Sequence, residues 1–263
     1  LGVLWPAMTP DLYSWFPHFS FTLTGAPVNV GLSPQRVAAL VTVWVLTWIN
    51  IRGVRQGKLV QTTLTIAKVG VLALLVILGL TVGRNATAIM ANFGAGNFAP
   101  HVDLNGAFVL AFGAAMVGSL FSSDSWNNVT FAAAEVQNPK RNLPLALALG
   151  AGSVTVLYIL ANFAYLSVLP MHGTAAGTSV LARGIQFATQ QRVGTATAEM
   201  IFGAAGGTIV AAAILVSTFG CNNGLILSGA RVYWAMARDG LFFTRAGKLS
   251  AREVPAFGLV IQG

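Results

Sequence analysis

A run of polar residues interrupts an otherwise apolar part of the chain. The run is SSDSWNN at residues 122–128, between AFVLAFGAAMVG and FAAA. Serine, aspartate and asparagine side chains bond to nearby backbone groups and so compete with helical hydrogen bonds. A helix that opened here would expose free N–H groups at one end and free C=O groups at the other, which suits a zwitterionic ligand. The alternative is an interhelical hydrogen-bond cluster that binds no ligand.

Lys68 is a second candidate, because it lies inside the apolar stretch TLTIAKVGVLALLV. A lysine at the centre of a membrane helix costs about 2.5–3.5 kcal/mol on insertion scales, so such a residue usually faces a cavity or a partner. The alternative is that its ammonium group extends to the lipid headgroups.

A third candidate is the segment STFGCNNGLILSGARVYWAMARDG, residues 217–240. Its glycines allow two helices to pack closely, which is a purely structural role. Packing does not explain why Ser217, Cys221, Asn222 and Asn223 lie on the same half of the segment. We therefore expect these polar groups to face a site or a partner.

Other chemistry is not indicated. His18, His101 and His172 are far apart in the sequence and do not have metal-ligand spacing. The sequence also has no nucleophile motif or phosphate-binding loop of the familiar kinds. We expect no cofactor, no metal and no enzymatic activity.

The composition indicates the class of protein. Of the 263 residues, 55% are hydrophobic and 8% are charged, whereas soluble domains carry about 25% charged residues. The formal net charge of +8 comes from basic residues that stand in short clusters between apolar segments. This distribution favours membrane orientation over nucleic-acid binding. The fold class predicted is an all-α polytopic membrane protein.

The apolar segments predict six membrane spans within a single transmembrane domain over residues 1–263. Each span needs about 20 mostly apolar residues. The spans are residues 34–51, 59–83, 107–138, 143–169, 200–237 and the start of one at 254–263, and the third is expected to break near 122–125. Ser33 and Pro34 predict the start of the first span. Residues 1–20 are interpreted as the tail of an earlier helix and an interfacial loop, and we expect the chain to be an interior piece of a longer protein.

Loop charges support this topology. Connections 52–58, 139–142 and 238–253 hold nine lysines and arginines, while 84–106 and 171–199 hold three. Alternate loops are therefore basic, as the positive-inside rule requires if every span crosses once. Asp124 is then predicted to lie at membrane depth.

Three ordered segments closely resemble signature regions of amino acid permeases of the amino acid–polyamine–organocation superfamily, particularly the L-type and bacterial members. They are NIRGVRQGKLVQTTLTIAKV, FSSDSWNNVTFAAAEVQNPKRNLPLAL and GCNNGLILSGARVYWAMARDGLFF. The resemblance implies a LeuT-type fold of two inverted five-helix repeats. On that mapping the chain covers helices four to eight and pieces of helices three and nine, without the first helix and its substrate-binding break.

The resemblance also implies roles for individual residues. Substrate contacts fall on Phe121, Ser122, Ser123, Asp124, Ser125, Trp126 and Asn127, with Phe121 as an aromatic gate. Lys68 matches a lysine that takes the place of a sodium ion, with Ser217 and Cys221 facing it, and Glu135 matches a cytoplasmic gate region. Serines at positions 123 and 125 depart from the aromatic residue and the glycine common in the family. This departure leaves the class of substrate open.

The predicted function is secondary active transport of amino acids by alternating access, through exchange or proton coupling, in the plasma membrane. The partners expected are an amino acid and the lipid bilayer, and a partner subunit or oligomer is left open. Two alternatives remain at this point. The chain could be a membrane scaffold or channel whose polar stretch serves packing or a pore, or the substrate could be a polyamine or another organic cation.

Overall fold

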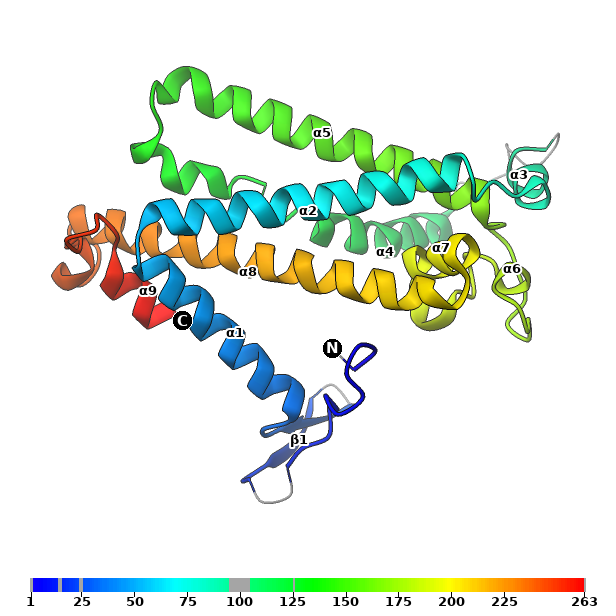
Figure 1. Cartoon of the computed structure of the whole chain (residues 1–263), viewed down its shortest axis with the longest axis horizontal. Helices are drawn as coiled ribbons and strands as arrows, with labels where there is room; N and C mark the ends of the chain where they lie inside the picture. Colours follow the sequence, from blue (N-terminus) through cyan, green and yellow to red (C-terminus); the bar gives the residue numbers. More distant parts are fainter. Residues whose placement is uncertain (1, 14–15, 24–25, 95–104, 125, 263) are drawn as a thin grey trace. The chain divides into compact units, whose positions relative to one another are not determined.

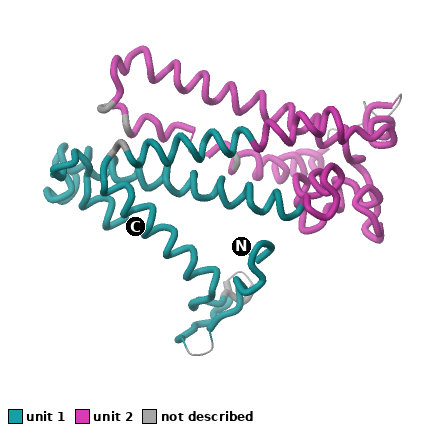
Figure 2. Tube along the Cα trace, viewed as in Figure 1, with its two compact units in different colours: residues 1–70, 207–263 teal, residues 71–206 magenta. Residues whose placement is uncertain are grey.

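A computed structural model describes residues 2–13, 16–23, 26–94, 105–124 and 126–262. The chain divides into two compact units, residues 1–70 with 207–263, and residues 71–206 (Figure 2). Most of the described residues are helical. The helices are α1 (Pro34–Ile51), α2 (Val54–Leu80), α3 (Ala86–Phe93), α4 (Gly106–Ser122), α5 (Pro139–Val168), α6 (Val180–Arg183), α7 (Val193–Phe202), α8 (Gly206–Arg238) and α9 (Ala256–Gln262) (Figure 1). Short 3-10 helices are η1 (Asn128–Glu135), η2 (Thr189–Gln191), η3 (Gly203–Ala205) and η4 (Thr244–Gly247).

Three described stretches are long and apolar enough to cross a membrane: Gln56–Leu80, Pro139–Val168 and Val193–Arg238. At 1.5 Å per residue, the 30 residues of α5 extend about 45 Å, more than a hydrocarbon core of about 30 Å. The third stretch, expected from the sequence as one span over 200–237, divides into α7 and α8. Gly203 makes the division, because its φ of 64° is a conformation that glycine adopts without steric cost.

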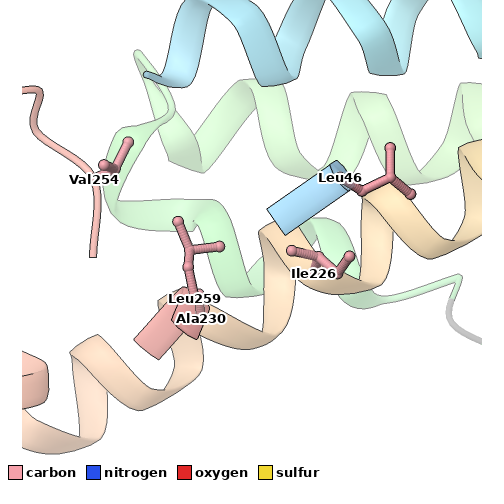
Figure 3. Close-up of a cluster of buried hydrophobic side chains, with 5 residues drawn as sticks. All are labelled: Leu46, Ile226, Ala230, Val254 and Leu259. Atoms are coloured by element: carbon pink, nitrogen blue, oxygen red, sulfur yellow. The ribbon is translucent and has the colours of Figure 1, made fainter. Parts of the chain in front are cut away.

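The start of α1 is as the sequence predicts. The Ser33 side chain accepts a hydrogen bond from the Arg36 backbone N–H at 3.3 Å, and Pro34 occupies the first turn. The buried core of the unit formed by residues 1–70 and 207–263 joins α1 to α8 and α9. It consists of Leu46, Ile226, Ala230, Val254 and Leu259 (Figure 3).

The expectation of an all-α chain is wrong before α1. Strands β1 (Phe19–Leu23) and β2 (Ala26–Val30) form an antiparallel pair, and the described residues before β1 contain no helix. Prolines at positions 6, 10 and 17 remove backbone donors and fix φ, which disfavours a helix there. The polar–apolar alternation that begins at Phe19 instead matches the period of a strand.

The unit of residues 71–206 is organised around the end of α5. The Asn92 side chain of α3 donates to Leu166 O at 2.7 Å and to Leu169 O at 2.8 Å, and accepts from Met171 N at 2.7 Å. These bonds satisfy carbonyl groups that a helix end leaves without intrahelical partners. A core of Val168, Leu169, Ala188 and Ala196 lies beside them.

Candidate functional site

The polar run ends a helix. α4 stops at Ser122, and Ser123 caps it with its backbone N–H bonded to Ser119 O at 3.1 Å and Leu120 O at 3.2 Å. Turns follow, and the 3-10 helix η1 begins at Asn128. The Ser123 hydroxyl also donates to Leu120 O at 3.0 Å, which is the local competition with helical bonding expected of a serine. The helical ladder is therefore interrupted beside Asp124, whose N–H bonds to Phe121 O at 3.3 Å.

An open cavity of about 450 Å³ lies between the end of α4 and the C-terminal half of α5. This volume is within the range of small-molecule sites, about 300–1,000 Å³. Its polar lining comes from both helices, and its apolar lining comes from α5 alone. The lining residues are Ser119, Ser123, Thr155, Tyr158, Ile159, Asn162, Phe163 and Leu166.

The hydrogen bonds of the lining residues determine what the cavity offers to a ligand. Thr155 Oγ1 donates to Ala151 O at 2.9 Å, and Asn162 Nδ2 donates to Tyr158 O at 2.8 Å. Ser123 likewise uses its proton on a backbone carbonyl. Oxygen lone pairs of these side chains remain as acceptors, which suits an ammonium group. None of the described lining residues is charged.

Phe121, Asp124, Trp126 and Asn127 are not among the described residues that line this cavity. Phe121 is 80% exposed and Trp126 is 64% exposed, and Asp124 and Asn127 are also exposed. Ser125 lies outside the described residues. The side chains of Ser122 and Glu135 are likewise outside the described part of the structure. Of the predicted substrate contacts, the structure brings Ser123 to the cavity, together with four polar residues that the sequence did not single out: Ser119, Thr155, Tyr158 and Asn162.

Lys68 lies in the other unit, half-buried on α2. α2 and α8 run in opposite directions, and two contacts set their register: Gln61 Oε1 with Asn223 Nδ2 at 2.9 Å, and Leu64 Cβ with the Cβ position of Gly220 at 3.3 Å. Continuing this register by one turn brings Lys68 to the level of Val216 and Ser217, which are also half-buried. Cys221, in contrast, is exposed.

A buried cluster of amides joins α1, α2 and α8, and we call it the amide cluster: Asn50, Gln61 and Asn223. Asn50 Nδ2 donates to Asn223 Oδ1 at 2.9 Å, and Asn223 Nδ2 donates to Gln61 Oε1 at 2.9 Å. Asn223 is fully buried and Asn50 nearly so. Gly57 makes room for the cluster, because a Cβ there would lie 2.3 Å from Asn50 Oδ1. The adjacent asparagines at 222–223 indicated a polar role, but nothing in the sequence identified Asn50 and Gln61 as the partners of Asn223.

Comparisons with known proteins show the family to which the sequence is related. The model of the family described as "Amino acid permease" matches residues 4–263. The chain is 31% identical over 237 residues to the serine/threonine exchanger SteT of Bacillus subtilis, covering 90% of this chain and 45% of that protein. It is 28% identical over 243 residues to the human b(0,+)-type amino acid transporter 1, covering 90% and 46%. It is also 28% identical over 235 residues to the mouse large neutral amino acids transporter small subunit 2, covering 89% and 40%. The chain thus spans less than half the length of these relatives.

Proposed function

Because the chain belongs to the amino acid permease family, we propose that the complete protein is a secondary transporter that exchanges amino acids across the membrane by alternating access. The chain is a multi-pass integral membrane protein, and its family and relatives are transporters rather than enzymes. The observation that carries the proposal is the interrupted helix beside a cavity of suitable size. α4 ends at Ser122, and Ser123 and the facing side of α5 line a space of about 450 Å³.

The site of the proposed transporter lies at this interruption. The ammonium group of the substrate bonds to oxygens at the end of α4 and on α5, because hydroxyl and amide lone pairs remain as acceptors there. Phe121, one residue before the end of α4, acts as an aromatic gate over the bound molecule. Trp126 and Asn127 border the site on the other side of the break. The apolar residues of α5 receive the aliphatic part of the substrate.

The proposed fold is LeuT-type. In it α1, α2, α5 and α8 are the fourth, fifth, seventh and eighth helices, and α4 with η1 forms the sixth, discontinuous helix. Discontinuous helices hold substrates in transporters of this kind, since their free backbone ends carry partial charges near the membrane midplane. Lys68, at the level of Val216 and Ser217 in the register of α2 and α8, supplies a fixed positive charge in place of a coupling ion. Glu135, at the end of η1, belongs to the cytoplasmic gate.

Neutral amino acids are the proposed substrates. The described residues that line the cavity carry hydroxyl, phenol and amide groups and no charge. An organic dication such as a polyamine would lose most of its hydration without gaining an opposite charge there, which is costly. The similarity to a protein named as a serine/threonine exchanger makes L-serine and L-threonine the first candidates.

Counterflow tests the proposal. The complete protein is reconstituted in liposomes loaded with unlabelled L-serine, and labelled L-serine is added outside, with putrescine as the parallel cation substrate. An exchanger accumulates label transiently and saturably, because each inward step is coupled to an outward one. Non-saturable entry that does not depend on internal amino acid would indicate a pore, and no entry of any amino acid tested would indicate a scaffold. Either result contradicts the proposal.

A further inference from the structure

The hairpin before α1 has one apolar and one polar face. Phe19 pairs with Val30, and Ser20 pairs with Asn29. Because side chains alternate across a strand, Phe19, Phe21 and Val30 lie on one face, while Ser20 and Asn29 lie on the other. Phe19 is 71% exposed, Phe21 is 50% exposed and Val30 is 49% exposed. The described residues of the chain thus leave this apolar face uncovered.

The hairpin is fixed to the first turn of α1. The Arg36 guanidinium donates from Nη1 to Gly31 O at 2.5 Å and from Nη2 to Asn29 O at 2.9 Å. Tyr13 N bonds to Leu32 O at 2.8 Å in the same region. The arginine directs its charge to the carbonyl groups at the end of β2. These bonds hold the hairpin at the N-terminal end of α1.

The proposed topology, in which α1 is one of the membrane spans, places this end of α1 at the membrane surface. The 18 residues of α1 extend about 27 Å, close to the thickness of the hydrocarbon core. The connection after α1 and the start of α2 are basic, with Arg52 in the connection and Arg55 and Lys58 in α2, which indicates the cytoplasmic side. The hairpin then lies at the opposite, outer interface. Exposed apolar side chains continue from it along α1: Val37, Leu40, Val41 and Trp44.

We propose that the apolar face of the hairpin inserts into the outer lipid interface and anchors the N-terminal end of α1. Residues 19–30 contain no charged residue, so entry into the headgroup region desolvates no ion. Aromatic side chains are enriched in this layer of membranes. An isolated two-stranded hairpin is marginally stable in water. Burial of Phe19 and Phe21 in lipid removes their side chains from water and so stabilises the hairpin. The exposed apolar side chains of α1 continue the apolar face of the hairpin along the membrane span of the proposed topology, and this continuity favours lipid as the occupant.

The alternation of faces provides the test and its control. In the complete protein without native cysteines, including Cys221, single cysteines at Phe21→Cys and Ser20→Cys are labelled with the fluorophore NBD. The protein is placed in vesicles of phosphatidylcholine and phosphatidylglycerol. The fluorescence of the NBD label is measured with two quenchers. One is a lipid that carries a nitroxide near its headgroup, and the other is iodide dissolved in the water. We expect the ratio of lipid quenching to iodide quenching to be at least about fivefold higher at position 21 than at position 20.

Two results would overturn the proposal. Equal access of iodide to both positions would place the hairpin in water. Protection of position 21 from both quenchers would show that protein covers this face. The pair Phe19→Cys and Asn29→Cys repeats the comparison on the two faces, in case one label distorts the turn. These measurements need membrane insertion alone, so they stand independently of whether counterflow is observed.

Discussion

Replacing Asn223 by alanine removes the centre of the amide cluster. The change deletes the 2.9 Å bonds to Asn50 and Gln61 and a longer one, 3.4 Å, to Gly57 O. Interhelical hydrogen bonds in membrane proteins contribute on average about 0.6 kcal/mol each, with a maximum of about 1.7. Amide groups left buried without partners add about 1–3 kcal/mol. The expected loss is about 2–4 kcal/mol.

The assay is thermal unfolding of the complete protein in detergent, followed by tryptophan fluorescence. One kcal/mol corresponds to about 2–4 °C in Tm for a chain of 150–250 residues, so a loss of about 2–4 kcal/mol corresponds to a decrease of about 4–16 °C on this scale. Asn222→Ala is the matched control, because Asn222 is half-buried and forms no side-chain hydrogen bond among the described residues. The control variant is expected to change Tm by less than about 2 °C.

A double-mutant cycle with Asn50→Ala then isolates the pair. Residues that share a hydrogen bond have a coupling energy of about 0.5–3 kcal/mol, whereas independent residues have additive effects. An unchanged Tm for Asn223→Ala, or strict additivity with Asn50→Ala, would refute the reasoning that this cluster holds α1, α2 and α8 together.

Three further changes test separate parts of the account. Lys68→Ala is expected to lower coupled uptake about 10- to 100-fold while membrane insertion stays intact, because a charge-assisted contact is worth about 1.5–3 kcal/mol. Unchanged uptake between about pH 5 and 8 would remove Lys68 from the mechanism. Phe121→Ala should raise the apparent Km of exchange about three- to tenfold through loss of an aromatic contact of about 1 kcal/mol, and equal affinity and turnover would argue against a gate. Gly57→Ala places a Cβ 2.3 Å from Asn50 Oδ1 and should destabilise the protein by about 1–3 kcal/mol. Gly70→Ala, where nothing lies within 4 Å, should be neutral or stabilising, and similar Tm values for the two glycine variants would contradict the packing.

Some local features of the fold could be predicted because they depend on neighbouring residues. Ser33 and Pro34 determine the start of α1 through one hydrogen bond and one fixed φ. The polar residues after Phe121 compete with helical bonding, and α4 ends at Ser122. Residues 19–30 contain a similar local signal, the alternation of apolar and polar residues with a period of two. The strands are only five residues each, so this signal is short and was not used to predict them.

The features that could not be predicted depend on which helices face each other. Asn162 and Thr155 line the cavity because α5 passes the end of α4, and no spacing within the sequence shows this. The partners of Asn223 lie 173 and 162 residues away, at Asn50 and Gln61. Their amide groups were visible in the sequence, but the register that joins them comes from packing.

The most direct test of the proposed site is whether substrate protects a cysteine at position 123 from forming a mixed disulfide with a thiol reagent. The complete protein without native cysteines, including Cys221, and carrying Ser123→Cys is reacted in liposomes with a small methanethiosulfonate reagent, with and without L-serine. Thr130→Cys serves as the control, because Thr130 is exposed and does not line the cavity. We expect saturating substrate to slow the reaction at position 123 at least about fivefold, with the control unchanged, and modification of position 123 to abolish counterflow. Equal reaction rates with and without a substrate that the protein exchanges would place the binding site elsewhere.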